Sequence, residues 1–103
     1  MKFHTANSFV GTEAWDATDI AEIDGASVRL HWTDKPYKWH VNDGQEVFVV
    51  IDGEIDMHYR KNGKDFVQNM VPGDICHADV GDEHVAHPLI ASRVLVIERK
   101  GSV

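Results

Sequence analysis

The feature that most constrains this chain is the close spacing of its turn signals. From residue 25 onward, Asp52-Gly53, Asn62-Gly63 and Pro72-Gly73 interrupt short runs of apolar residues, and each of these dipeptides is typical of a tight turn. The intervals between them leave room for short strands and for no helix of ordinary length. Many short strands between glycine-rich turns indicate an all-β sandwich or barrel.

The runs between those turns have the composition and alternation of strands. Val28, Leu30 and Trp32 alternate with polar residues and therefore lie on one face of a strand. The run EVFVVI at residues 46–51 is rich in β-branched residues, which is typical of a central strand with both faces covered. The expected strands cover residues 27–32, 37–41, 46–51, 55–60, 66–71, 75–78, 84–87 and 93–99.

A chain of 103 residues is long enough for one domain only. Residues 1–24 show no strong periodicity, so we expect an irregular N-terminal lead-in that packs on the barrel, with room for one short strand or turn. Residues 25–103 form the expected barrel domain. Because the chain has a single cysteine, Cys76, an intrachain disulfide is excluded.

The charge balance argues against two classes of partner. Ten basic and seventeen acidic residues give a formal net charge of −7, which repels phosphate backbones and anionic lipid. We therefore expect neither a nucleic acid nor a membrane as a partner. The N-terminus lacks the continuous apolar stretch of a signal peptide, so we expect a cytoplasmic protein.

Histidine is unusually frequent, with seven in the chain, and it is the commonest metal ligand. His40 and Asn42 are two residues apart, so in an extended segment their side chains leave the same face. The tight turn that follows is expected to fold Glu46 back beside them in an antiparallel arrangement. Glu46 is also an acid at the head of an apolar strand, where burial is costly without a compensating cation or donor. His84 reaches this group only if the barrel closes.

At these positions the sequence resembles the cupin superfamily, and in particular its small single-domain members. The resemblance rests on two motifs that together extend over about half of the chain. The first is carried by His40, Asn42, Glu46 and Gly53, and the second by Gly73, Gly81 and His84. The resemblance implies a cupin-type double-stranded β-helix, which is a jelly-roll barrel.

The chain departs from both motifs. Asn42 stands where the first motif usually has its second histidine, and Asp34 stands where that motif begins with glycine. In the second motif, Asp79 replaces a proline and Pro88 an asparagine. Asn42 can ligate through its carbonyl oxygen or, without ligating, hold a metal-bound water as a donor, and both interpretations stay open.

The resemblance implies one divalent metal ion, namely Fe, Mn, Ni, Co or Zn. Its expected ligand set is His40, Asn42, Glu46 and His84. The alternative is a metal-free barrel whose polar interior is held by hydrogen bonds.

Three further residues are candidates for the pocket and for acid–base chemistry. His31 shares a strand face with Arg29 and can line the barrel. Tyr59 lies on an alternating strand. His87 is three residues beyond His84 and points the other way on a regular strand, unless a bend at Pro88 turns it into the site.

These features predict a metal-dependent enzyme of the dioxygenase, isomerase or lyase type that acts on a small polar or anionic molecule. The alternative is a non-catalytic barrel that binds or senses a small ligand, and a third interpretation is a simple dimerisation unit. Small cupins similar to this one imply a homodimer, with Phe3, Phe9 and Trp15 of the lead-in as contributors to the contact.

Overall fold

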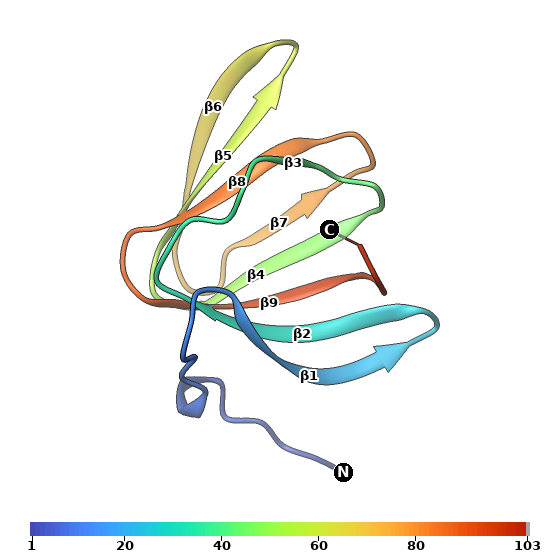
Figure 1. The fold of residues 1–103 in the computed structure, drawn as a ribbon, viewed down its shortest axis with the longest axis vertical. Helices are drawn as coiled ribbons and strands as arrows, with labels where there is room; N and C mark the ends of the chain where they lie inside the picture. Colours follow the sequence, from blue (N-terminus) through green and yellow to red (C-terminus); the bar gives the residue numbers. More distant parts are fainter. Residues whose placement is uncertain (103) are drawn as a thin grey trace.

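The computed structural model describes residues 1–102 and shows two antiparallel sheets that face each other (Figure 1). A short 3-10 turn, η1 at Ala6–Ser8, precedes the strands. The strands are β1 Asp16–Ile23, β2 Ala26–Thr33, β3 His40–Val41, β4 Glu46–Asp52, β5 Ile55–Lys61, β6 Lys64–Met70, β7 Ile75–Ala78, β8 Glu83–Pro88 and β9 Ser92–Arg99. The all-β prediction is confirmed.

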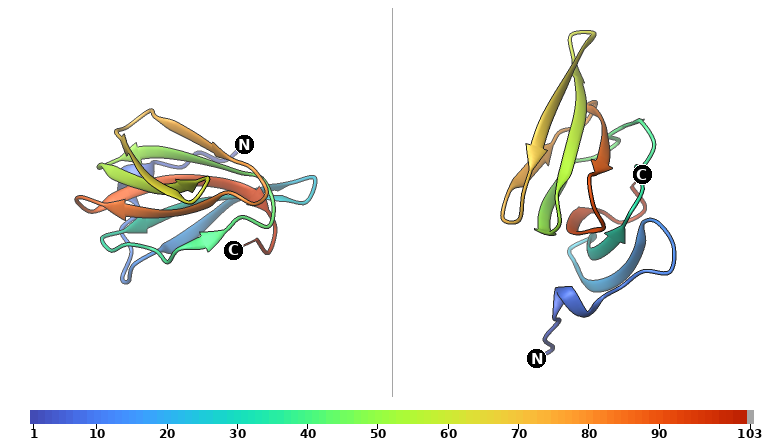
Figure 2. Two further views of the ribbon diagram at one scale, coloured as in Figure 1. Left: turned by 90° about the horizontal axis from the view of Figure 1, so that it is seen from above. Right: turned by 90° about the vertical axis from the view of Figure 1, so that its left-hand side faces the viewer.

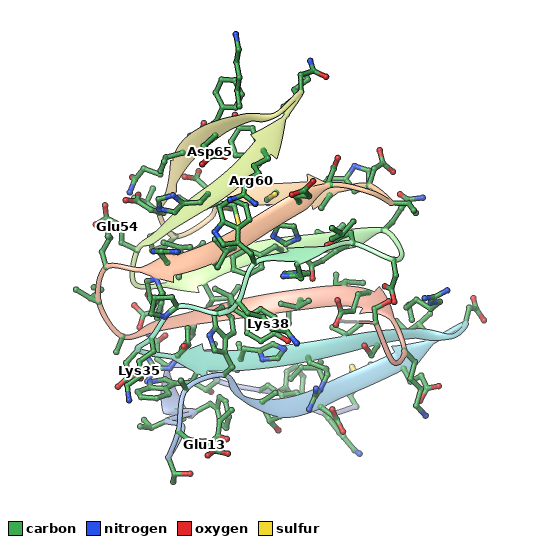
Figure 3. All side chains as sticks on the ribbon, turned by 45° about the horizontal axis from the view of Figure 1, so that its top comes forward. Glu13, Lys35, Lys38, Glu54, Arg60 and Asp65 are labelled. Carbon is green, nitrogen blue, oxygen red and sulfur yellow. The ribbon has the colours of Figure 1, made fainter. Side chains whose placement is uncertain are left out.

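Strands that are far apart in the sequence lie side by side. One sheet has the order β1-β2-β9-β4-β7 and the other β3-β8-β5-β6, so the chain passes repeatedly between the two layers. This is the topology of a jelly-roll barrel, as predicted. The β5–β6 hairpin extends beyond the rest of the barrel (Figure 2), and on it Arg60 pairs with Asp65 at 2.9 Å (Figure 3).

The interior is built in layers because side chains alternate along each strand. Val50 of β4 stands opposite Val94 of β9, and one layer further along Phe48 stands opposite Val96. These four side chains are buried together with residues of the facing sheet. The next layer pairs Glu46 with Glu98, so the apolar core ends there and a polar layer begins.

The N-terminal region is more ordered than the sequence predicts. Residues 16–23 form the edge strand β1, which pairs with β2 along its length, so only residues 1–15 lead into the barrel. Phe3 is 88% exposed and stays available for the predicted homodimer contact, which remains a prediction. Trp15, in contrast, packs against the core. Val103 of the predicted barrel range lies outside the described residues.

Two strands differ in detail from the prediction. The expected strand at 37–41 shrinks to the two residues of β3. β4 is buried on one face only, because Glu46, Phe48 and Val50 point inward while Ile51 is 37% exposed. In residues 1–102, no helix combines the length and the apolar character that crossing a membrane requires.

Gly53 provides a test of the barrel packing. It has a φ of +90°, and an added Cβ would lie 2.7 Å from the backbone Cα of Ser92, a fully buried residue. We expect Gly53→Ala to lower the free energy of unfolding by about 3 kcal/mol, because strain at positive φ and overpacking add. Gly63→Ala is the control: its φ is +74° with nothing within 4 Å, so about 1 kcal/mol is expected. Equal losses in urea unfolding would contradict the packing argument.

Candidate metal centre

Two histidines of the polar layer are brought together by strand pairing. His40 of β3 and His84 of β8 are direct partners in the antiparallel ladder, so their side chains leave the same face of the sheet. Their rings lie 4.3 Å apart between centroids. Nδ1 of His40 is 3.0 Å from the carbonyl oxygen of Lys38, which precedes β3 (Figure 3). A hydrogen bond to this carbonyl places the proton on Nδ1 and leaves Nε2 with a lone pair, as in metal-ligating histidines.

Glu46 reaches the histidines from the opposite sheet, and this corrects the expected geometry. β3 does not pair with β4: β3 pairs with β8, whereas β4 pairs with β7 and β9. The turn after Asn42 therefore carries the chain across the barrel instead of folding it into a hairpin. His40 and Glu46 still converge, because the inner faces of the two sheets face the same interior. Oε1 of Glu46 lies 3.5 Å from Nε2 of His84.

Asn42 is the most tightly held member of the group. Its backbone N–H donates to the carbonyl of Asp82, and its own carbonyl accepts from the N–H of Gly81. Its side-chain Oδ1 lies 2.7 Å from Nε2 of His84. An amide oxygen can only accept, so His84 donates this hydrogen bond. Asn42 thus fixes the direction of the His84 ring.

A second carboxylate, Glu98, stands at the site and was missed from the sequence. It lies directly opposite Glu46 in the β4–β9 ladder and lines the same cavity as His40 and His84. The signal was available: Val94, Val96 and Glu98 alternate along β9, so an acid falls on the inward face of an apolar strand. The same reasoning that selected Glu46 applies to Glu98.

The surroundings shift the pKa values of two members in opposite directions. Burial, together with a hydrogen bond and charge repulsion from Glu98, raises the pKa of Glu46 to about 8. Burial and the nearby His40 lower the pKa of His84 to about 4. At neutral pH the imidazole of His84 is therefore neutral, which is the form that binds metals.

The residues present fit a divalent metal ion. Around His84 Nε2, Asn42 Oδ1 lies at 2.7 Å and Glu46 Oε1 at 3.5 Å, close to the roughly 3 Å between neighbouring ligand atoms when metal bonds measure 2.0–2.2 Å. The other nitrogen of His84, Nδ1, is buried without a hydrogen-bond partner among residues 1–102. Within that range, however, no three His, Cys, Asp or Glu side chains already converge as a formed metal cluster. A metal would draw these donors together.

The three predicted pocket residues lie in three different places. His31 lines the cavity of about 260 Å³ that also contains His40, Glu46 and His84, and burial lowers its pKa. Tyr59 is the ladder partner of His84 but lines a separate cavity of about 610 Å³ between the β5–β6 hairpin and β7.

His87 lies outside both cavities. It faces outward beside His58, with ring centroids 4.2 Å apart. The alternation of β8 continues unbroken through Pro88, so the bend that would have turned His87 inward is not present.

Comparison with known proteins identifies the architecture. A scan of protein-family models gives no match, and no curated protein matches at the sequence level. Among solved structures, a cupin-2 domain protein from Shewanella frigidimarina is 22% identical with a TM-score of 0.75, and the match covers 87% of this chain and 85% of that protein. This chain has the cupin fold.

Two further solved structures show the range of proteins with a similar barrel. A Klebsiella pneumoniae protein with a double-stranded β-helix domain is 18% identical with a TM-score of 0.75, over 98% of this chain and 91% of that protein. A hydroquinone 1,2-dioxygenase from a Sphingomonas species is 20% identical with a TM-score of 0.77. The latter match covers 86% of this chain and 28% of the dioxygenase.

Proposed function

We propose that this protein is a metal-dependent cupin enzyme that acts on a small polar or anionic molecule. The observation that carries the proposal is the grouping of two imidazoles and a carboxylate, His40, His84 and Glu46, in the polar layer above the apolar core. Buried Glu46 faces half-buried Glu98 in one layer, so the two carboxylates can be ionised together at low cost only if a cation lies between them. A divalent metal supplies that charge.

His40, Glu46 and His84 are the proposed ligands, and Asn42 either ligates or holds a metal-bound water. Two histidines and one carboxylate with open positions suit non-haem Fe(II), although Mn, Ni, Co or Zn fit the same donor types. When bound, the ion would polarise a substrate oxygen or, if it is iron, activate dioxygen. The dioxygenase among the structural neighbours supports this class. An isomerase or a lyase would use the same donors.

The chain's own residues prepare the site in three ways. Asn42 orients the metal-free His84 ring by accepting a hydrogen bond from Nε2 at 2.7 Å, a bond that ends when Nε2 gives up its proton to bind an ion. The Lys38 carbonyl orients His40 through Nδ1 and leaves Nε2 of His40 free. The apolar layer of Phe48 and Val96 beneath the site excludes water from one side. His31 borders the same cavity and is neutral at pH 7, so it can accept a proton from a bound molecule.

The alternative function is a barrel that binds a small ligand without chemistry. The same cavity of about 260 Å³ serves a binder as well as an enzyme. Turnover of a bound compound distinguishes an enzyme from a binder. Whether the protein binds a metal ion has to be measured first.

Metal analysis of protein purified without a histidine tag tests the proposal. After chelation and reconstitution, we expect about one equivalent of Fe, Mn, Co, Ni or Zn to remain bound after gel filtration. The double variant His40→Ala/His84→Ala should retain less than a tenth of that amount. The matched control is His58→Ala/His87→Ala, which removes the outward-facing pair and should bind like the wild type. Equal metal content in both double variants would rule out the site.

A further inference from the structure

Each of the two sheets presents one pair of donor side chains to the same cavity. His40 and His84 are direct partners in the β3–β8 ladder, and Glu46 and Glu98 are direct partners in the β4–β9 ladder. Direct partners have Cβ atoms about 4.5–5.5 Å apart on the same face of their sheet. All four residues line the cavity of about 260 Å³. A pair of imidazoles and a pair of carboxylates thus share one space.

Glu98 lies close enough to Glu46 for both carboxylates to reach one ion. A hydrogen bond links the two carboxyl groups in the metal-free protein, and a hydrogen bond between oxygens spans about 2.5–3.0 Å. Ligand atoms that share an ion at about 2.0–2.2 Å are separated by a similar distance, roughly 3 Å. An ion bound to Glu46 is therefore within reach of the Glu98 carboxylate.

The basic side chains of residues 1–102 leave this carboxylate pair unbalanced. Arg29 lines the same cavity, but its guanidinium pairs with Asp19 at 2.8 Å. The ion-pair contact of Glu46 is with His84 at 3.5 Å, and Glu98 takes part in no ion pair within this range. A divalent ion supplies the two positive charges that the pair lacks.

Asn42 stands at the motif position of the missing histidine, yet it is placed less well than Glu98 to replace that ligand. Asn42 is 4% exposed and is not among the residues that line the cavity. Glu98 is half-buried and opens onto the cavity beside both histidines. A carboxylate also carries a negative charge, which the amide of Asn42 lacks. Glu98 is therefore the residue that can restore a fourth strong donor.

We propose that Glu98 is a ligand of the metal ion and takes the place of the histidine that the cupin motif has and this chain lacks. The inference rests on the proposed function, because it concerns the same ion. The ligand set is then His40, His84, Glu46 and Glu98, two residues from each sheet. Two carboxylates cancel the charge of a divalent ion, which lowers the cost of holding it away from water. A six-coordinate ion with these four ligands keeps two positions for other molecules.

Titration of metal-free protein with Co²⁺ tests the proposal, because one visible spectrum reports both the affinity and the ligands of this ion. Glu98→Gln should bind Co²⁺ at least about tenfold more weakly than the wild type, a loss no smaller than that caused by removing a residue behind a ligand. Its Co²⁺ spectrum should also change. The matched control is Glu22→Gln, which removes a carboxylate that pairs with Lys100 at 3.2 Å outside the cavity. This control should keep the wild-type affinity and spectrum.

Glu98→Asp separates direct ligation from an effect of charge alone. It keeps the negative charge but withdraws the carboxylate by one methylene group, so direct ligation predicts a weaker affinity and a changed spectrum here as well. Wild-type affinity in Glu98→Asp, together with an unchanged spectrum in Glu98→Gln, would show that Glu98 acts only through its charge and would overturn the proposal.

The outcomes also separate this proposal from the metal site itself. If both Glu98 variants bind Co²⁺ like the wild type while His40→Ala/His84→Ala loses it, Glu98 is not a ligand and the metal site stands. A wild type that takes up no divalent ion overturns both proposals. Circular dichroism of the metal-free variants checks their folding. Glu98→Gln should unfold at no lower temperature than the wild type, because it removes the repulsion between two carboxylates.

Discussion

Metal-free protein is expected to lose stability as the pH rises from 6.5 to 8, by about 2 kcal/mol. The pKa of Glu46 is raised to about 8 in the folded state, so the folded protein keeps a proton that the unfolded chain has already released. Stability therefore falls with rising pH, by up to about 1.4 kcal/mol per pH unit. For a domain of this size the loss corresponds to a decrease of roughly 10 °C in the melting temperature.

The loss of stability with rising pH is expected to be visible only above pH 6.5, because protonation of His84 has the opposite effect on stability below that pH. The pKa of His84 is lowered to about 4, so between pH 4 and 6.5 the unfolded chain binds a proton that the folded protein does not. In that range stability rises with pH and offsets the contribution of Glu46. Thermal unfolding of chelator-treated protein at half-unit steps of pH measures both parts of the profile.

A glutamine at position 46 provides the decisive comparison. Glu46→Gln keeps the size of the side chain but cannot ionise, so the decline between pH 6.5 and 8 should disappear. Glu22→Gln on the exposed edge strand β1, where Glu22 pairs with Lys100 at 3.2 Å, should leave the decline unchanged. A decline that persists in Glu46→Gln would show that another group carries it. Bound metal should also abolish the decline in the wild type, because it replaces the proton on Glu46.

The sequence predicted the polar layer but not how it is assembled. The spacing of His40 and Glu46 indicated a hairpin, whereas they lie on facing sheets and meet across the interior. His84, for which the sequence offered no local reason, is fixed by direct pairing with His40. A two-residue period fixes which face a side chain occupies, but it does not fix which strand becomes the neighbour. Which strands become neighbours depends on pairing between segments far apart in the sequence, such as β3 with β8 and β4 with β9.

The N-terminal region shows where single-sequence reasoning is weakest. Residues 16–23 have little periodicity, yet they form β1, because the free edge of β2 offers backbone partners whatever the side chains are. Trp15, for which the sequence suggested only a dimer contact, lines the cavity, and the dimer contact stays a prediction. The positive φ of Trp15 is set by the hydrogen bonds of Asp16 and the packing of Gly11. Glu98, in contrast, could have been predicted from the alternation of β9.

Asparagine at position 42, where the cupin motif usually has histidine, leads to the second large prediction. Asn42→Ala is expected to weaken metal binding about 10- to 100-fold while the stoichiometry stays at one, because it removes an oxygen 2.7 Å from the ligating nitrogen of His84 that binds the ion or holds a metal-bound water. The variant also leaves Nε2 of buried His84 without its 2.7 Å acceptor. The metal-free protein should therefore lose about 1–3 kcal/mol of stability.

Asn42→His restores the residue that the cupin motif usually has, and it decides between the two roles of Asn42. Imidazole is a stronger ligand than an amide oxygen for Co, Ni and Zn, so an affinity at least tenfold above the wild type would mean that position 42 faces the metal directly. The visible spectrum of Co²⁺-loaded protein, which responds to ligand type and geometry, should then change as well. If Asn42→His leaves the spectrum unchanged while Asn42→Ala still weakens metal binding, Asn42 does not ligate and instead holds a metal-bound water. If Asn42→Ala and Asn42→His both bind metal as tightly as the wild type, Asn42 does not contribute to metal binding. The 2.7 Å contact to His84 would then stabilise only the metal-free protein.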